Sequence, residues 1–399
     1  MRDIVIAAPT RIAIGKMGGT IAEVTAIDLA KTVIKGVIDR SGVAPESVDE
    51  VIMGHARQSS DDPNIARLAA LKAGIPETTA AYTIMRQCAS GMTAVHNAAM
   101  SIMCGVNETV IAGGCESMSR AIFYLRNARF GLGTGNVTLY DSVTEVQVNS
   151  QPQEMYGTFN MGQTAENVAE KLGISREEQD AFAFSSQEKA HAAISNGLFA
   201  DEIVPVSIPQ RKADPIIFDK DEHPRLTSLE ALAKLKPVFK EGGTVTAGNA
   251  SGRNDGASAM LVTSLENAKS KNLSPVAKII GMGTSGLDPK IMGLGPVEAT
   301  KKALKHAGLS MNDIGLIELN EAFAAQALGC IWEMGLKERM DIINVNGGAN
   351  AYGHPIGSTG ARILVSLALQ MRRQNVKYGL ATLCIAGGLG QSTILELID

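Results

Sequence analysis

The chain has 399 residues, of which 45% are hydrophobic and 20% charged, and its formal net charge is −4 with acidic and basic residues interspersed. This composition is typical of a globular protein with about two or three cores. It offers neither a basic surface for nucleic acid nor a polybasic membrane anchor, and no apolar run approaches the ~20 residues that span a bilayer. We therefore expect small molecules or further copies of the chain as partners, with no nucleic acid and no membrane.

Five cysteines, an odd number, accompany an N-terminus without signal-peptide character. This combination predicts free thiols in a reducing, cytoplasmic compartment. The spacings of cysteine and histidine do not match those of zinc sites, so we expect no metal.

An internal repeat organises the chain into two α/β units. Residues 26–55 read as an amphipathic helix, a turn, a short acidic segment and a buried strand, and residues 296–321 repeat this plan. Each unit continues with a helix and a second apolar strand, which we predict to end in the same four residues, Ile-Ala-Gly-Gly, at 111–114 and 385–388. Strands that alternate with helices predict largely parallel sheets covered by helices.

The spacing after the first strand of each unit is also the same. Gly54 precedes Cys88 by 34 residues (88 − 54), and Asn320 precedes His354 by 34 residues (354 − 320). Cys88 and His354 each lie in a glycine-containing turn that opens a helix. A duplicated unit would bring both turns into one cleft.

Between these units the character of the chain changes. The segment after Met118 is rich in glycine and polar residues, then predicts helices over 162–172 and 176–196, and returns through a glycine-rich turn near Gly248. It has no counterpart in the second unit. We therefore predict three parts: an N-terminal half of residues 1–118 and 249–272, an inserted lid or substrate-binding domain of residues 119–248, and a C-terminal half of residues 273–399.

Four short motifs occur in a fixed order: Cys-x-Ser-Gly at 88–91, Asn-Glu-Ala-Phe at 320–323, Gly-His-Pro-x-Gly at 353–357 and Cys-x-Ala-Gly-Gly-x-Gly at 384–390. Together they resemble the catalytic motifs of the thiolase family, and the resemblance covers nearly the whole chain. It implies an α/β protein with a duplicated, five-layered α/β/α/β/α fold. It also implies an acyltransferase that uses coenzyme A as substrate or product, with no tightly bound cofactor, and that assembles as a homodimer or homotetramer.

Three side chains are expected to carry the chemistry. A thiolate becomes a strong nucleophile when a helix N-terminus or an imidazole lowers its pKa, which suits Cys88 before its helix. By resemblance, His354 takes the proton of Cys88, and Cys384 is a second acid/base group that exchanges a proton with the α-carbon of an acyl-CoA. The remaining cysteines are expected to be structural.

Both the enolate and the tetrahedral intermediate of this chemistry need fixed hydrogen-bond donors. The resemblance assigns one oxyanion hole to His354 and a water held by Asn320. It assigns the other to the backbone N–H groups of Cys88 and Ala386. Ala386 stands where the family usually has glycine, which restricts the conformations of this donor.

The CoA moiety is expected, again by resemblance, to contact five residues. Ser251 lies in the glycine-rich turn, while the other residues line the pantetheine path or, in the case of Arg225, meet a phosphate. A solvated surface arginine is the alternative for that last residue. These expected CoA-binding residues are Ser251, Met161, Ala322, Phe323 and Arg225.

Asn160 is the candidate that bears on substrate choice. Short-chain acetoacetyl-CoA thiolases typically carry His-Met-Gly here, whereas this chain has Asn160 at that position of the substrate pocket, which cannot titrate near neutral pH. We favour condensation of acetyl-CoA to acetoacetyl-CoA and the reverse thiolysis. A medium- or long-chain 3-ketoacyl-CoA thiolase of fatty-acid β-oxidation is the alternative. More remote are a ketoacyl-synthase-like condensing enzyme and a non-catalytic acyl-CoA-binding protein.

Overall fold

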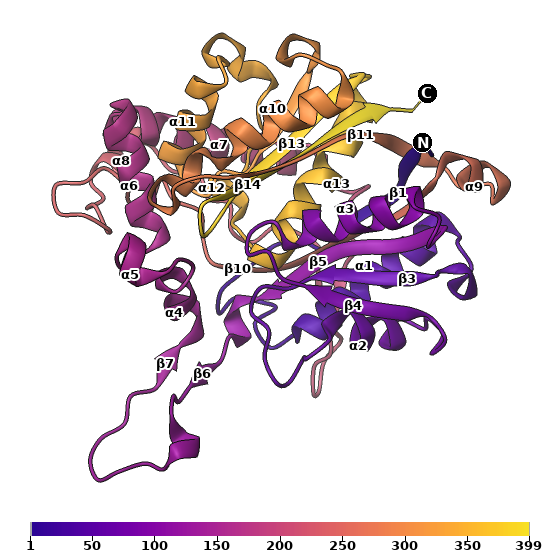
Figure 1. Cartoon of the computed structure of the whole chain (residues 1–399), viewed down its shortest axis with the longest axis horizontal. Coiled ribbons are helices and arrows are strands. Elements are labelled where there is room, and N and C mark those ends of the chain that lie inside the picture. The colour runs from indigo at the N-terminus through magenta and orange to yellow at the C-terminus, as the bar shows by residue number, and fades with distance from the viewer. Residues whose placement is uncertain (1, 399) are drawn as a thin grey trace.

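A ten-stranded mixed sheet forms the backbone of the computed structural model, which describes residues 2–398 (Figure 1). Nine strands follow one path, and the tenth, β2, pairs with β10. In spatial order the path is β12 (Leu316–Leu319), β13 (Tyr378–Ile385), β14 (Leu389–Leu397), β11 (Pro275–Gly286), β1 (Ile4–Arg11), β10 (Asn254–Ser264), β5 (Thr109–Ser117), β3 (Glu50–Gly54) and β4 (Ala80–Ile84), with β2 at Gly15–Lys16.

The strand order confirms the predicted duplication. In the N-terminal half, β3 is parallel to β5, which is antiparallel to β10, which is antiparallel to β1. In the C-terminal half, β12 is parallel to β13, which is antiparallel to β14, which is antiparallel to β11. The two halves join where β1 pairs with β11. The same unit therefore occurs twice, and equivalent strand ends face one region between the halves.

Helices cover these sheet halves in layers. α3 (Ser90–Met103) and α13 (Ile356–Gln374) pack on each other and on both halves of the sheet. α1 (Ala26–Ser41) and α2 (Ile65–Lys72) cover the outer face of the N-terminal half. α10 (Gly295–Ala307) and α11 (Ala324–Glu333) share a core with the C-terminal strands. The order helix, sheet, helix, sheet, helix is the expected five-layered arrangement.

Alternate side chains of β1 point to opposite faces of the sheet, so this strand contributes to two hydrophobic cores. Ile4 and Ile6 belong to the central core around α3 and α13, while Val5 and Ala7 belong to the outer core beneath α1. All four side chains are at most 1% exposed, so both faces of the strand are buried. Because both faces are covered, the central strands read as continuous apolar runs.

One expectation about the repeat is wrong. The strand β5 does not end with the motif at 111–114 but continues to Ser117, so both glycines lie inside the strand. Both glycines of the motif at 385–388 instead form the turn after β13, with φ values of 91° and 81°. A Cβ atom at Gly114 would overlap the carbonyl oxygen of Gly357. Gly114 is therefore needed for the close approach of α13, not for a turn.

The segment between β5 and β10 packs largely against the C-terminal half. Its two long helices match the predicted ones to within one residue, and both contact α11. A thin arm, residues 121–141 with the hairpin β6–β7, projects from the body (Figure 1). The helices and strands of this segment are β6 (Phe123–Tyr124), β7 (Tyr140–Asp141), α4 (Ser142–Val148), α5 (Gln153–Tyr156), α6 (Met161–Leu172), α7 (Arg176–Ser195), β8 (Val206–Ile208), β9 (Ile216–Phe218) and α8 (Leu229–Ala233). Elsewhere are α9 (Leu265–Ser270), α12 (Ala349–Tyr352) and short 3₁₀ helices at Pro45–Ser47, Met118–Arg120, Ala128–Phe130, Pro289–Leu294, Met311–Asp313 and Lys337–Ile342.

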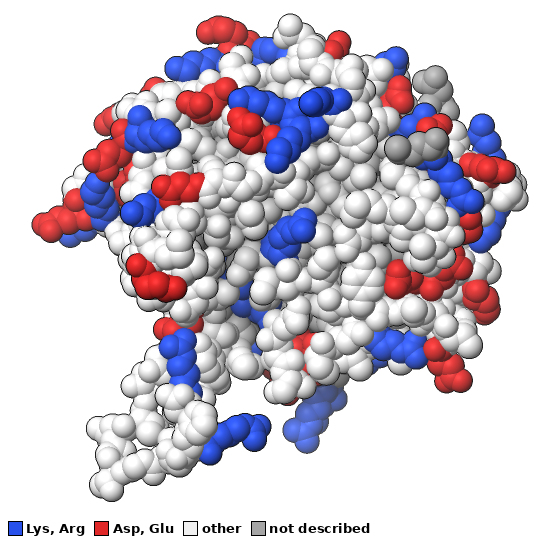
Figure 2. All heavy atoms as spheres, in the orientation of Figure 1, with Lys and Arg blue, Asp and Glu red and all other residues white. Residues whose placement is uncertain are grey.

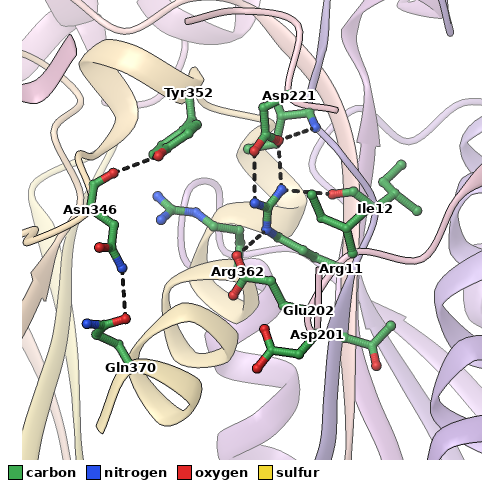
Figure 3. Close-up of polar contacts among 12 residues, drawn as sticks. Arg11, Ile12, Asp201, Glu202, Asp221, Asn346, Tyr352, Arg362 and Gln370 are labelled. Carbon is green, nitrogen blue, oxygen red and sulfur yellow. Dashed lines mark hydrogen bonds and ion pairs between the residues drawn. The ribbon is translucent and has the colours of Figure 1, made fainter. Parts of the chain in front are cut away.

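Arg11, at the end of β1, ties this segment to the body through buried charges (Figure 3). Its guanidinium group donates two hydrogen bonds to the Asp221 carboxylate, at 2.7 and 2.9 Å, and one to Glu202 at 2.9 Å. Nearby, Arg362 on α13 pairs with Glu318 on β12 at 3.3 Å. The bidentate, buried pair of Arg11 with Asp221 fixes geometry strongly. Within residues 2–398, no helix is both long and apolar enough to cross a bilayer.

Candidate active site

Cys88, His354 and Cys384 line one cavity, together with Ala386. Cys88 lies in the turn before α3, His354 in the turn before α13 and Cys384 near the end of β13. The duplicated scaffold thus brings together side chains that are up to 296 residues apart in sequence (384 − 88). Within residues 2–398, no cluster of three or more metal-ligating side chains occurs at this cavity or elsewhere.

A tight turn presents Cys88 to the cavity. Ser90 closes it, because its hydroxyl accepts a hydrogen bond from the Arg86 backbone N–H at 2.8 Å and donates one to the Gln87 carbonyl at 2.7 Å. Gln87 itself has a φ of 45°, in the left-handed region that non-glycine residues seldom adopt. Such strain is maintained where a residue must be held in place, which here is the following Cys88.

Opposing effects act on the Cys88 thiol. Burial raises its pKa, while the backbone N–H groups of Ala386 and of Cys88 itself, and the positive charge of Arg57, oppose the increase. The two backbone donors therefore face the sulfur. They form the pair that an oxyanion on a carbon attached to this sulfur requires.

His354 is held by its main chain and by its ring. The backbone N–H of His354 donates to Asn254 Oδ1 at 3.1 Å. Its neighbour Gly353 has a φ of 91°, and a Cβ atom there would collide with the Asn254 amide. Glycine is therefore required before the histidine on two counts.

The hydrogen bonds of His354 also set its tautomer. Its Nδ1 lies 2.7 Å from the hydroxyl oxygen of Thr359, and that hydroxyl donates its own hydrogen to the Pro355 carbonyl at 3.0 Å. The Thr359 oxygen must then accept, so Nδ1 carries the hydrogen and Nε2 carries the lone pair. Nε2 is buried, without a hydrogen-bond partner in residues 2–398. Burial lowers the pKa of the imidazole to about 3, and the charges of Arg362 and Arg57 add to this.

Cys384 is fully buried close to Cys88. It packs with Met292 and Ala322, and burial raises its pKa far above the ordinary value, with a further increase from the charge of Cys88. The resting group is therefore a thiol. A thiol can donate a proton to a departing carbanion and, as thiolate, take one back.

Asn320 occupies the end of β12, where its backbone N–H donates to the Thr382 carbonyl at 3.0 Å. Both polar atoms of its side chain are buried and without a hydrogen-bond partner in the described chain. A buried amide in this state is rare in proteins and has the chemistry to hold a water molecule. The neighbouring Glu321 fixes this loop by accepting hydrogen bonds from Asn344, Ser186 and Asn350.

Ala386 has an ordinary backbone conformation. The positive φ values in this turn belong to the two glycines that follow it, and Ala386 is not among the residues with positive φ. The departure from glycine therefore imposes no backbone strain. Its N–H keeps its orientation toward Cys88.

Four of the five expected CoA-binding residues line the cavity, namely Ser251, Met161, Ala322 and Phe323. The Ser251 backbone N–H donates to the Ala322 carbonyl at 3.0 Å, which joins the glycine-rich turn to the Asn-Glu-Ala-Phe loop. Arg225 does not line the cavity. It is exposed on the surface, and its backbone N–H donates to Gln187.

Asn160 is also absent from the cavity lining, although the next two residues contribute to it. Its side chain accepts a hydrogen bond from the Gln163 backbone at 3.0 Å, and Gln163 returns one to the Asn160 backbone at 2.9 Å. This reciprocal pair is a capping box that begins α6. The structure therefore gives the Asn160 side chain a helix cap in place of the expected pocket contact.

The sequence analysis did not predict a role for Arg57 or for the buried pair of His55 and Glu116. Arg57 lines the cavity, and its backbone N–H donates to Glu116 at 3.1 Å. Glu116 also accepts from the Ala56 and Gly357 backbones and lies 3.1 Å from His55. Burial opposes charge on both partners, yet their attraction lowers the pKa of Glu116 and raises that of His55. No short motif marks these residues.

Comparison with known proteins identifies the family. The N-terminal domain model of thiolases matches residues 4–266, and the C-terminal domain model matches residues 273–397. The chain belongs to the thiolase family. It is an acyltransferase with the thiolase fold, as the motifs and the layered architecture predicted.

Similar proteins share its full length. An acetyl-CoA acetyltransferase of Chromobacterium violaceum is 50% identical and a probable acetyl-CoA acyltransferase of Staphylococcus aureus is 48% identical, each with 99% of both chains covered. The crystal structure of a Bacillus anthracis acetyl-CoA acetyltransferase matches with a TM-score of 0.96 at 46% identity, and human mitochondrial 3-ketoacyl-CoA thiolase with 0.94 at 43%. Both structural matches cover 100% of this chain and 99% of the other.

Proposed function

We propose that this thiolase acts on short chains, condensing two acetyl-CoA molecules to acetoacetyl-CoA and catalysing the reverse thiolysis. The observation that carries the proposal is the unpartnered Nε2 of His354 in the cavity shared with Cys88 and Cys384. The names of full-length relatives support acetyl transfer. Coenzyme A takes part as substrate and product, and the reaction needs no tightly bound cofactor.

In the first half-reaction, His354 Nε2 takes the proton of Cys88. The thiolate attacks the thioester carbonyl of acetyl-CoA, and the backbone N–H groups of Cys88 and Ala386 stabilise the tetrahedral oxyanion. CoA leaves with the proton of the Cys384 thiol, which becomes a thiolate, while the proton from Cys88 stays on His354 Nε2 and the acetyl group stays on Cys88. Ser251, Met161, Ala322 and Phe323 contact the pantetheine arm.

In the second half-reaction, the Cys384 thiolate removes a proton from the methyl carbon of a second acetyl-CoA. The enolate oxygen is stabilised by the N–H of His354 Nε2 and by a water held on Asn320. The enolate carbon attacks the acetyl group on Cys88, the carbon–sulfur bond breaks, and acetoacetyl-CoA is released. The Cys88 thiolate then takes its proton back from His354. Thiolysis follows the same steps in reverse.

Cleavage of a 3-oxoacyl-CoA series from four to eight carbons, with CoA as co-substrate, tests this proposal. Highest kcat/KM for the four-carbon compound supports the short-chain function. A preference for eight carbons would instead assign the chain to fatty-acid β-oxidation. Absence of cleavage of every member, with the protein folded, would refute the proposed function.

We also propose that the protein is a homo-oligomer, a dimer or tetramer, and that it acts in the cytoplasm. We propose in addition that residues 119–248 form a separate inserted domain. The arm supports assembly because it is largely uncharged in Figure 2 and exposes large apolar side chains, with Phe130 89% and Phe123 64% exposed. Five unpaired cysteines agree with a reducing compartment. Light scattering of the purified protein measures the assembly directly.

A further inference from the structure

Arg57 places a positive charge in the catalytic cavity that the reaction proposed above does not use. Arg57 follows β3 in the chain and lines the same cavity as Cys88. Its charge acts on the Cys88 thiol and on the His354 ring, where it favours the thiolate and the neutral imidazole. Arg57 therefore lies on the nucleophile's side of the cavity.

The guanidinium group of Arg57 has no anionic partner. Its one hydrogen bond in residues 2–398 goes to the adjacent Ala56 carbonyl at 3.3 Å, and no carboxylate lies within 4.0 Å. Its Nε is buried and makes no hydrogen bond within the described chain. A half-buried guanidinium with an unused buried N–H favours binding of an anion.

The nearby carboxylate of Glu116 is engaged elsewhere. It is fully buried, bonded to His55 at 3.1 Å and to three backbone N–H groups, one of which belongs to Arg57 itself. These bonds fix the main chain of Arg57 relative to the start of α13. The backbone of Arg57 is therefore fixed, while its guanidinium group has no carboxylate partner among the described residues. A binding site for an anionic ligand requires this combination.

Two further polar side chains line the same cavity as Arg57. Gln87, immediately before the nucleophile, lines the cavity, and its side chain makes no hydrogen bond within residues 2–398. Gln147 also lines it, with its amide N–H donated to the Val143 carbonyl at 3.2 Å. The cavity that contains Cys88 therefore offers a cation and amide groups to an acyl chain, whereas Met292, among others, gives the cavity its apolar part.

We propose that the acyl pocket accepts 3-oxoacyl-CoA substrates whose acyl chain ends in a carboxylate, and that Arg57 binds this carboxylate. The inference rests on the proposed thiolase function and adds a substrate class to it. With 3-oxohexanedioyl-CoA, the Cys88 sulfur bonds to the 3-oxo carbon and the bond between C2 and C3 breaks. C2 leaves as acetyl-CoA after taking a proton from Cys384. The butanedioyl group left on Cys88 has a free carboxylate for Arg57, and CoA then displaces it as succinyl-CoA.

Two substrates of equal chain length test the proposal: 3-oxohexanoyl-CoA, which ends in a methyl group, and 3-oxohexanedioyl-CoA, which ends in a carboxylate. The wild-type enzyme is expected to have the higher kcat/KM for the carboxylate. Arg57→Met is expected to lower the ratio of the two kcat/KM values about 10- to 100-fold, as loss of a charged hydrogen bond predicts. Arg57→Lys keeps the charge and is expected to lose less of the ratio.

Arg253→Met is the matched control. Arg253 also lines the cavity, but it is exposed and adjoins Gly252 and Ser251 in the turn expected to meet CoA, which both substrates carry. The ratio is therefore expected to stay at the wild-type value in this variant. An equal loss of both activities in Arg57→Met would refute the proposal. It would indicate instead that Arg57 acts by stabilising the Cys88 thiolate.

Titration of the Cys88→Ser protein with succinyl-CoA and butanoyl-CoA gives an independent readout without turnover. Tighter binding of succinyl-CoA that is lost in Cys88→Ser/Arg57→Met supports the proposal, and equal binding of the two contradicts it. Wild-type cleavage of acetoacetyl-CoA without a carboxylate preference would overturn this inference alone. Failure to cleave any 3-oxoacyl-CoA would overturn the proposed function itself.

Discussion

Replacing Thr359 by valine tests how the fold sets the tautomer of the catalytic imidazole. The Thr359 hydroxyl accepts a 2.7 Å hydrogen bond from His354 Nδ1 and has its own hydrogen engaged by the Pro355 carbonyl. Valine has nearly the same shape but no acceptor. The Nδ1–H is then buried and unpaired, at a cost of about 1–3 kcal/mol, or the hydrogen moves to Nε2 and the base is lost.

Either outcome lowers the population of the productive tautomer. A cost of about 1–3 kcal/mol corresponds to a decrease of roughly 5- to 150-fold in kcat/KM. Steady-state thiolysis of acetoacetyl-CoA measures this decrease, and the burst of acyl-enzyme in a single turnover assigns it to the step that uses His354. Thr359→Ser keeps the hydroxyl and is expected to retain most of the activity.

Thr300→Val is the control for loss of a buried hydroxyl. Thr300 lies on α10, where its hydroxyl is 3.0 Å from that of Ser392, away from the cavity lining. It is expected to lower the thermal midpoint without the loss in kcat/KM. Thr359→Val with wild-type kinetics and an unchanged fold would refute the claim that Thr359 sets the tautomer.

Three further predictions concern the reactivity of Cys88 with pH, the alanine at position 386 and the ionisation of Glu318. Because burial raises the pKa of Cys88 and leaves the imidazole neutral, the rate of Cys88 alkylation by iodoacetamide should still be rising at about pH 9, whereas a plateau from about pH 6 would reveal a resting thiolate–imidazolium pair. Ala386→Gly should change kcat/KM by less than about tenfold, since the alanine is unstrained and the N–H remains; a larger loss would mean that the side chain matters. Burial raises the pKa of Glu318 to about 7, above its ordinary 4.5, so the folded state keeps this proton while the unfolded state ionises, and the protein loses stability as pH rises between these values. The unfolding midpoint of Glu318→Gln should therefore rise relative to wild type over that window, and a constant difference would contradict this.

The sequence predicted the parts of the fold that depend on repeated local patterns. Apolar periodicity and the two equal spacings located the duplicated units, and the structure repeats the order and directions of four strands in each half. The end of β5 was predicted wrongly because a glycine in a turn and a glycine at a close backbone approach look the same in one sequence. Gly114 serves the second purpose, and only the position of α13 reveals it.

For the site, the order of the motifs predicted which chemical groups gather there. It did not predict how neighbouring side chains, such as those of Asn160 and Arg57, are oriented. The pattern Asn-x-x-Gln at 160–163 already contained a capping-box signal, which competes with any pocket role for Asn160. Arg57 had no such signal, because its place in the cavity depends on a loop held by Glu116 from another strand. Tertiary contacts of this kind leave no periodic pattern in the sequence.

Mass spectrometry of the intact protein after brief incubation with acetyl-CoA tests the central claim most directly. The account predicts the mass of one acetyl group added to each chain, located on Cys88 by peptide mapping, absent in Cys88→Ser and removed by added CoA. Cys384→Ser should still become acetylated, because Cys88 and His354 remain and CoA can leave as a thiolate. An unmodified wild-type chain, or acetylation that persists in Cys88→Ser, would contradict the account.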